Sequence, residues 1–130
     1  MKKLFLSLLI IMTICCGCME KKEEVIEEPV VKTPTAEEIA KEKKAKAEET
    51  MINLKKSALV YYEEKQFDAN TADKPIKIDF SAGAPSDFVY SGITPEKGVI
   101  VINTNKNITM TNMVVNGFMC HFEDDKVICE

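Results

Sequence analysis

Hydrophobic and polar residues follow three different patterns along this chain of 130 residues. An apolar run interrupted only by Ser7 and Thr13 occupies residues 4–14, a repeat of three and four positions follows Thr35, and a repeat of two begins at Ile76. A period near 3.6 indicates an amphipathic helix, whereas a period of two indicates a strand with one buried face. The pattern therefore predicts a leader, then a helix, then a sheet.

The helical region has a clear start signal. The tetrapeptide TAEE at Thr35 has the form of a capping box, in which Thr35 caps the helix and Glu38 reaches back to the cap. No Gly or Pro follows until well beyond residue 67, so we expect one helix over 35–67. Its first half is mostly Lys, Glu and Ala, as in a solvated helix. Its second half carries an apolar face made of Ala47, Met51, Leu54, Ala58 and Tyr62.

We expect that apolar face to pack against the rest of the domain. A coiled coil with a partner is the alternative, although the repeat is short for three heptads.

Residues 68–130 carry the signals of an antiparallel meander. Period-two patterns predict strands over 76–80, 98–103 and 108–115, and residues 88–90 form a shorter candidate strand. Asn116-Gly117 is the strongest hairpin signal, because both residues tolerate positive φ. The sequence thus predicts an α+β fold, a long helix on a C-terminal antiparallel sheet, with residues 35–130 as one domain.

The last two strands predict a disulfide. If Asp124-Asp125 is a two-residue turn, Glu123 pairs with Lys126 and the fourth pair outward is Cys120 with Cys129. That pair is not hydrogen-bonded, so its α-carbons approach to about 4.5 Å, within the disulfide range. We expect the core face of this hairpin to consist of Phe118, Cys120, Phe122, Val127 and Cys129.

The start of the chain has the layout of an export signal: two lysines, the apolar run and then small residues. The run is shorter than the about 20 residues of a membrane-spanning helix. Its end, Cys15-Cys16-Gly17-Cys18, resembles the lipobox of bacterial lipoproteins, with Gly17 before the cut and Cys18 as the lipid acceptor.

This resemblance implies a signal peptide over 1–17 and diacylglycerol on Cys18. It departs from the lipobox at Cys15, where an aliphatic residue is usual, so Cys16 remains an alternative acceptor. An ordinary secretory signal or an uncleaved N-terminal anchor would also fit the leader. Residues 18–34 are rich in charge and interrupted by Pro29, so we expect a flexible tether there.

Net charge and the positions of the cysteines limit the classes of partner and the cellular compartment. The formal net charge is −4, and loss of Lys2 and Lys3 with the leader makes the remainder more acidic, which argues against nucleic acid. Three of the five cysteines lie in the leader and two near the C-terminus. This split fits a chain that is oxidised outside the cytoplasm.

The order of long helix, variable loop, meander and C-terminal disulfide hairpin resembles the soluble half of type IV pilins and pseudopilins. Residues 54–62 on the helix and 117–129 at the end carry the resemblance. It implies a pilin-like head. The chain departs from pilins at its start, where a lipoprotein leader and a charged helix replace the prepilin cleavage site and the hydrophobic assembly helix.

No catalytic or cofactor motif is evident. His121 is the only histidine and is adjacent to Cys120, and adjacent strand residues point to opposite faces. A zinc site with Cys120, His121 and Cys129 lacks a fourth ligand. We therefore expect no enzyme, no metal and no cofactor.

The leading hypothesis is a non-enzymatic lipoprotein whose head binds another envelope protein. It would lie at the outer membrane in a two-membrane cell, and otherwise on the outer face of the plasma membrane. A second hypothesis is a small-ligand module with a pocket between helix and sheet, and a third is an accessory factor of a pilus or secretion system. The ligand-contact candidates are Tyr61, Tyr62, Phe80 and Tyr90.

Overall fold

Helix α2 (Ala36–Lys65) is the first element of the region that the computed structural model describes, residues 33–130. It begins at the expected capping box: the Glu38 N–H donates to Thr35 Oγ1 at 3.3 Å, and the Thr35 N–H donates to Glu38 Oε2 at 2.9 Å. These bonds satisfy donors that an uncapped helix would leave free. The predicted helix is confirmed, with its end at Lys65 instead of residue 67.

The two halves of α2 differ in burial as expected. Residues 36–46 are all exposed. The predicted apolar face is buried, with exposures of 3% or less at Ala47, Met51, Leu54, Ala58 and Tyr62. The helix therefore joins the core only from Ala47 onward. Within residues 33–130, no helix is both long enough and apolar enough to cross a membrane.

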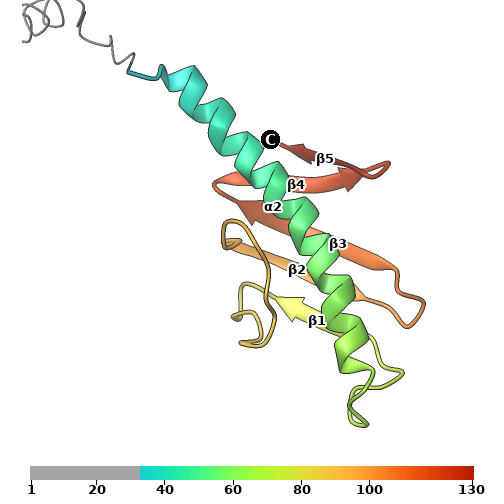
Figure 1. Cartoon of the computed structure of the whole chain (residues 1–130). Coiled ribbons are helices and arrows are strands. Elements are labelled where there is room, and N and C mark those ends of the chain that lie inside the picture. The colour runs from blue at the N-terminus through green and yellow to red at the C-terminus, as the bar shows by residue number, and fades with distance from the viewer. Residues whose placement is uncertain (1–32) are drawn as a thin grey trace, which may run out of the picture. The chain divides into compact units, whose positions relative to one another are not determined.

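Five strands form one antiparallel meander in chain order. They are β1 (Ile76–Asp79), β2 (Lys97–Ile102), β3 (Ile108–Val115), β4 (Phe118–Glu123) and β5 (Lys126–Cys129). Figure 1 shows α2 lying diagonally across one face of this sheet. The largest fully buried sheet side chains are Ile78, Ile100, Ile102, Met113 and Val115. The predicted α+β class is confirmed.

The predicted strand at 88–90 is wrong. Residues 80–96 form a long loop between β1 and β2 without a strand. Phe88 is nevertheless only 5% exposed, because its ring packs against other aromatic rings. Of this apolar triplet Phe88 is thus buried by side-chain packing without a strand partner, whereas Val89 is 80% exposed.

The C-terminal hairpins have the predicted geometry. Asn116 and Gly117 both have positive φ, 55° and 85°, at the β3–β4 turn. The register of β4 with β5 runs from Glu123↔Lys126 to Cys120↔Cys129, as expected. Cys120 and Cys129 form a disulfide with their α-carbons 4.1 Å apart. The partly buried Phe118, Phe122 and Val127 pack against the core on the same face.

A bulge bends β3 at Asn112. Lys97 pairs with Val114 and Val99 with Thr111, so Asn112 and Met113 together lie opposite Gly98. Asn112 has φ of 52°, a conformation that Asn tolerates better than most residues. Beyond the bulge the sheet opens: the β3–β4 ladder stops at Met113↔Cys120.

Candidate functional site

Three of the four aromatic ligand candidates lie together, around a residue that was not among them. Phe88 makes an edge contact with Tyr61 at 5.3 Å between ring centroids and stacks on Tyr90 at 5.4 Å. Phe80 contacts Phe88 and Tyr90 at 6.3 and 6.0 Å. The rings fill the space between the 80–96 loop and the helix, so the loop is held by aromatic packing. Such pairs each contribute about 0.5–1.5 kcal/mol beyond area burial.

Tyr62 lies apart from this cluster. Its hydroxyl donates to the backbone oxygen of Thr104, in the β2–β3 turn, at 3.4 Å. Adjacent helix positions point about 100° apart, which explains why Tyr61 and Tyr62 have different neighbours. The structure therefore brings together Tyr61, Phe80 and Tyr90 and separates Tyr62.

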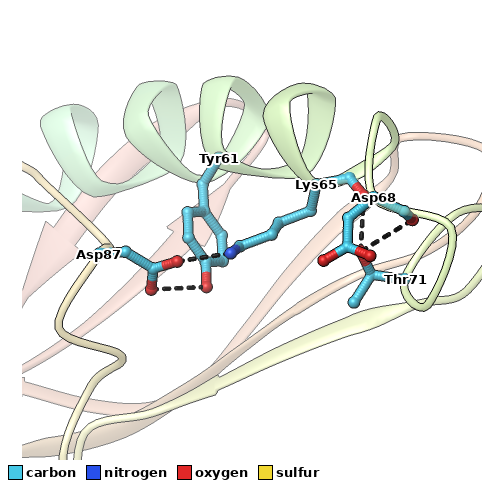
Figure 2. Close-up of polar contacts among 5 residues, drawn as sticks. All are labelled: Tyr61, Lys65, Asp68, Thr71 and Asp87. Atoms are coloured by element: carbon cyan, nitrogen blue, oxygen red, sulfur yellow. Dashed lines mark hydrogen bonds and ion pairs between the residues drawn. The ribbon is translucent and has the colours of Figure 1, made fainter.

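A polar clamp, consisting of Tyr61, Lys65 and Asp87, fastens the loop to the helix (Figure 2). The Tyr61 hydroxyl donates to Asp87 Oδ1 at 3.1 Å, and Lys65 Nζ lies 2.5 Å from Asp87 Oδ2. Lys65 Nζ also lies 5.3 Å from the centroid of the Tyr61 ring. Nearby, the Lys65 carbonyl at the helix end accepts from the Thr71 hydroxyl at 2.6 Å and from the Asp68 N–H at 3.2 Å.

The clamp shifts three pKa values. The hydrogen bond from Lys65 lowers the pKa of Asp87, and the same bond raises the pKa of Lys65. Burial raises the pKa of Tyr61, with a further contribution from the hydrogen bond to Asp87. Each shift favours the protonation state that holds the clamp closed. The clamp is structural in character, since its polar groups are paired with each other.

Beside it, Tyr61 and Asp87 share a shallow hollow of about 120 Å³ with Ser57, Val60, Glu64 and Val89.

A larger cavity, of about 220 Å³, lies where β3 and β4 separate. It is lined by Lys55, Ile108, Thr109, Met110, His121 and Phe122. Lys55 Nζ contacts Asp125 Oδ1 at 2.8 Å and lies 4.7 Å from the centroid of the Phe122 ring. The hydrogen bond from Lys55 lowers the pKa of Asp125. The cavity combines one cation, hydrogen-bonding side chains and an apolar wall.

The sheet face that points away from α2, called the outer face below, carries apolar side chains. By alternation with the buried positions, its members include Val99, Val101, Val114, Met119 and Ile128. Met119 is 58% exposed and the other four are half-buried. Charged side chains share the face, among them Lys77, Lys97 and Glu123. Lys97 lies directly opposite Val114, so apolar and charged side chains are mixed on this face, as they are at many protein interfaces.

The cysteines and the histidine considered for a metal site do not lie together on one face of the sheet. Cys120 and Cys129 are joined to each other and nearly fully buried, at 2% and 0% exposure. His121 is exposed and lies on the other face of β4 from Cys120. Within residues 33–130, no group of three or more His, Cys, Asp or Glu side chains is arranged to hold a metal ion. Cys18, Cys16 and the expected signal peptide lie outside the described residues.

The signal for the cavity was present in the sequence but could not be interpreted alone. Asn112 interrupts a β-branched strand, which marks a bulge, but the sequence does not reveal that Lys55 of α2 lies beside the resulting gap.

Comparison of the chain with protein-family models, with curated proteins and with solved structures finds no match.

Proposed function

We propose that the protein is a non-enzymatic bacterial lipoprotein, anchored through Cys18, whose pilin-like head binds a second envelope protein. The leader and the tether motivate the anchor, and the helix-on-meander order motivates the comparison with pilins. The cell envelope is the proposed location: the outer membrane in a two-membrane cell, and otherwise the outer face of the plasma membrane.

Within residues 33–130, the outer face keeps apolar side chains accessible to solvent, and this observation carries the binding role. Helix α2 and the 80–96 loop bury the opposite face, while Val99, Val101 and Val114 remain half-exposed beside Met119. Val114 and Met119 lie directly opposite each other, with Lys97 on the other side of Val114. Exposed apolar side chains are a common feature of interaction sites. The occupant we propose is a different envelope polypeptide, which would bury these apolar side chains and contact the charged ones beside them.

The anchor is tested by metabolic labelling with an alkyne analogue of palmitate. The wild-type chain should be labelled and should partition into detergent. Cys18→Ala with Cys16 intact should abolish the label. Retention of the label in Cys18→Ala and its loss in Cys16→Ala would move the acceptor to Cys16, and an unlabelled wild-type chain would contradict the anchor.

The binding face is tested by photo-crosslinking in intact cells. A photoreactive amino acid at Met119 should form an adduct with one identified envelope protein. The matched control is Val60, an apolar residue of similar exposure on α2, 55% against 58%. The adduct at Met119 should weaken when Thr111→Lys places a charge on the same face. Equal adducts at both sites, or an adduct only with a second copy of the chain, would contradict the proposal.

Binding of a small ligand is a second candidate function, and the cavity between β3 and β4 favours it. The aromatic ligand-contact candidates predicted from the sequence do not. Three of those residues pack against Phe88, whereas the cavity is lined by other side chains.

A further inference from the structure

The gap between β3 and β4 is built into the fold by the bulge at Asn112. The last residue pair of this ladder is Met113↔Cys120, although β3 extends back to Ile108 and β4 extends on to Glu123. On their other sides both strands stay paired, β3 with β2 and β4 with β5. Two firmly held strands thus diverge, and the cavity lies between their unpaired halves.

Backbone groups of the diverging halves are directed into the gap. The hydrogen bond from Asn103 N–H to the Asn107 carbonyl fixes which residues of β3 bond to β2. By alternation, Thr109 and Thr111 bond to β2, whereas the N–H and C=O of Ile108 and Met110 point the other way. The same counting from the bonds of Met119 with Glu130 directs the backbone of Phe122 toward β3. A ligand here would meet donors and acceptors as well as side chains.

Lys55 supplies the only full charge among the lining residues. Its partner Asp125 is outside the lining, and the Asp125 side chain is 90% exposed. Such an exposed ion pair contributes little to stability. Breaking the contact between Lys55 and Asp125 therefore costs little free energy, because water can solvate the Asp125 carboxylate. An ammonium has three donors, which allows Lys55 to bind an anion while staying over the Phe122 ring.

From these features we propose that the gap binds a small organic carboxylate with an apolar body. Lys55 would hold the carboxylate, with Thr109 and His121 as hydrogen-bonding neighbours, and Ile108, Met110 and Phe122 would contact the body. A volume of about 220 Å³ has room for a ligand of several carbon atoms, and hexanoate is the probe we choose. This site goes beyond the proposed protein-binding role and uses other residues.

The test follows Met110 by NMR in the full chain, purified in detergent and labelled with ¹³C at the methionine methyl groups. Hexanoate should shift the Met110 methyl signal in a saturable manner. The signals of Met51 and Met113, which are fully buried and do not line the cavity, should stay in place and report an intact core. Hexanamide has the same shape without charge and should bind at least about five-fold more weakly, since hydrogen bonds to charged groups are stronger.

Three substitutions separate the proposed contact from general charge effects. Lys55→Gln should remove the difference between hexanoate and hexanamide. Asp125→Asn should tighten hexanoate binding about two- to five-fold by freeing Lys55, and Asn tolerates the positive φ of this turn position. Asp124→Asn is the matched control, because Asp124 is the neighbouring acidic residue and Lys55 contacts Asp125.

An unmoved Met110 signal in the wild type, or equal binding of acid and amide, would overturn the proposal. Equal effects of Asp124→Asn and Asp125→Asn would do so as well. If Lys55→Gln disturbs the core signals, the comparison of the two turn variants still decides, because both lie in an exposed turn. Failure here leaves crosslinking at Met119 unaffected, so the two proposals are tested separately.

Discussion

At the scale of single residues, Gly98 has the strictest requirement. Its φ is +134°, and a Cβ there would lie 2.8 Å from the Met113 Cα and against the Met113 sulfur. Backbone strain of this kind costs about 1–3 kcal/mol and overpacking about 1–3 kcal/mol. Gly98→Ala should therefore lower the free energy of unfolding by about 2–6 kcal/mol in urea titrations. Gly83→Ala is the control: Gly83 also has positive φ, +96°, but a Cβ there meets nothing within 4 Å. Equal losses in the two variants would show that Met113 does not restrict the site.

Asp87 should give the clamp a dependence on pH. Because its pKa is lowered in the folded state, its contribution is complete above its unfolded pKa of about 3.9 and is lost as pH falls through the lower folded value. The raised pKa values of Lys65 and Tyr61 have the opposite sense: their contributions are complete below about pH 10 and are lost as pH rises through the folded values. The clamp should thus be fully formed between about pH 5 and 9.

The measurement is the unfolding midpoint of wild type and Asp87→Asn from pH 7 to pH 2. The variant should be less stable at pH 7, and the difference should disappear as the acid limit is approached. Asp124→Asn, in the exposed β4–β5 turn, should not show this convergence. A difference between wild type and Asp87→Asn that persists unchanged at pH 2 would exclude the ion pair as its cause.

At the scale of elements, the β4–β5 hairpin is stabilised by its disulfide. The bridge spans a sequence separation of nine residues. A loop of this size gives about 3 kcal/mol in the chain-entropy description. A reductant should lower the free energy of unfolding of the wild type by about that amount. Cys120→Ala/Cys129→Ala should be destabilised at least as much and should no longer respond to the reductant. A wild-type urea midpoint that is insensitive to reduction would contradict this account.

Elements with a strong local signal were predictable from the sequence. The capping box fixed the start of α2, Asn116-Gly117 fixed one turn, and counting from Asp124-Asp125 gave the register that pairs Cys120 with Cys129. The strand predicted at residues 88–90 was wrong, because an apolar pattern indicates that a side chain is buried but does not indicate whether a strand or side-chain packing buries it. Phe88 is buried by the ring of Tyr61, which lies on the helix far away in the sequence, and by the ring of Tyr90 in its own loop.

At the scale of the whole molecule, the surfaces were harder to predict than the core. The sequence indicated which face of each strand is apolar, but it could not show that, among residues 33–130, the outer face keeps apolar side chains accessible to solvent. The cavity depends on the bulge at Asn112 and on Lys55, which are brought together only by the packing of α2 on the sheet. The aromatic candidates rest on residue type, and residue type does not distinguish a ring that packs from one that lines a pocket.

The division of α2 into a solvated and a packed part predicts where the folding unit begins. Residues 36–46 are exposed, and among the described contacts their tie to the sheet is the bond from Asn116 Nδ2 to the Lys43 carbonyl at 3.1 Å. Starting the chain at residue 46 removes that bond and the cap, which should cost about 1–3 kcal/mol. Starting it at residue 52 also removes Ala47, Thr50 and Met51, and loss of a buried Met alone costs about 2–5 kcal/mol.

The two truncations should therefore behave differently in urea. The chain from 46 should unfold in one cooperative transition whose midpoint lies below that of the chain from 34 only by what the cap and the Asn116 bond contribute, about 1–3 kcal/mol. The chain from 52 should have lost most of its stability, because the Thr50 hydroxyl also accepts from the Ile93 N–H at 3.0 Å and so holds the loop. If both truncations were equally destabilised, the exposed turns would belong to the folding unit. If neither were, the packing of α2 at Met51 would contribute little. The two truncations thus predict that the folding unit begins inside α2, between residues 46 and 52.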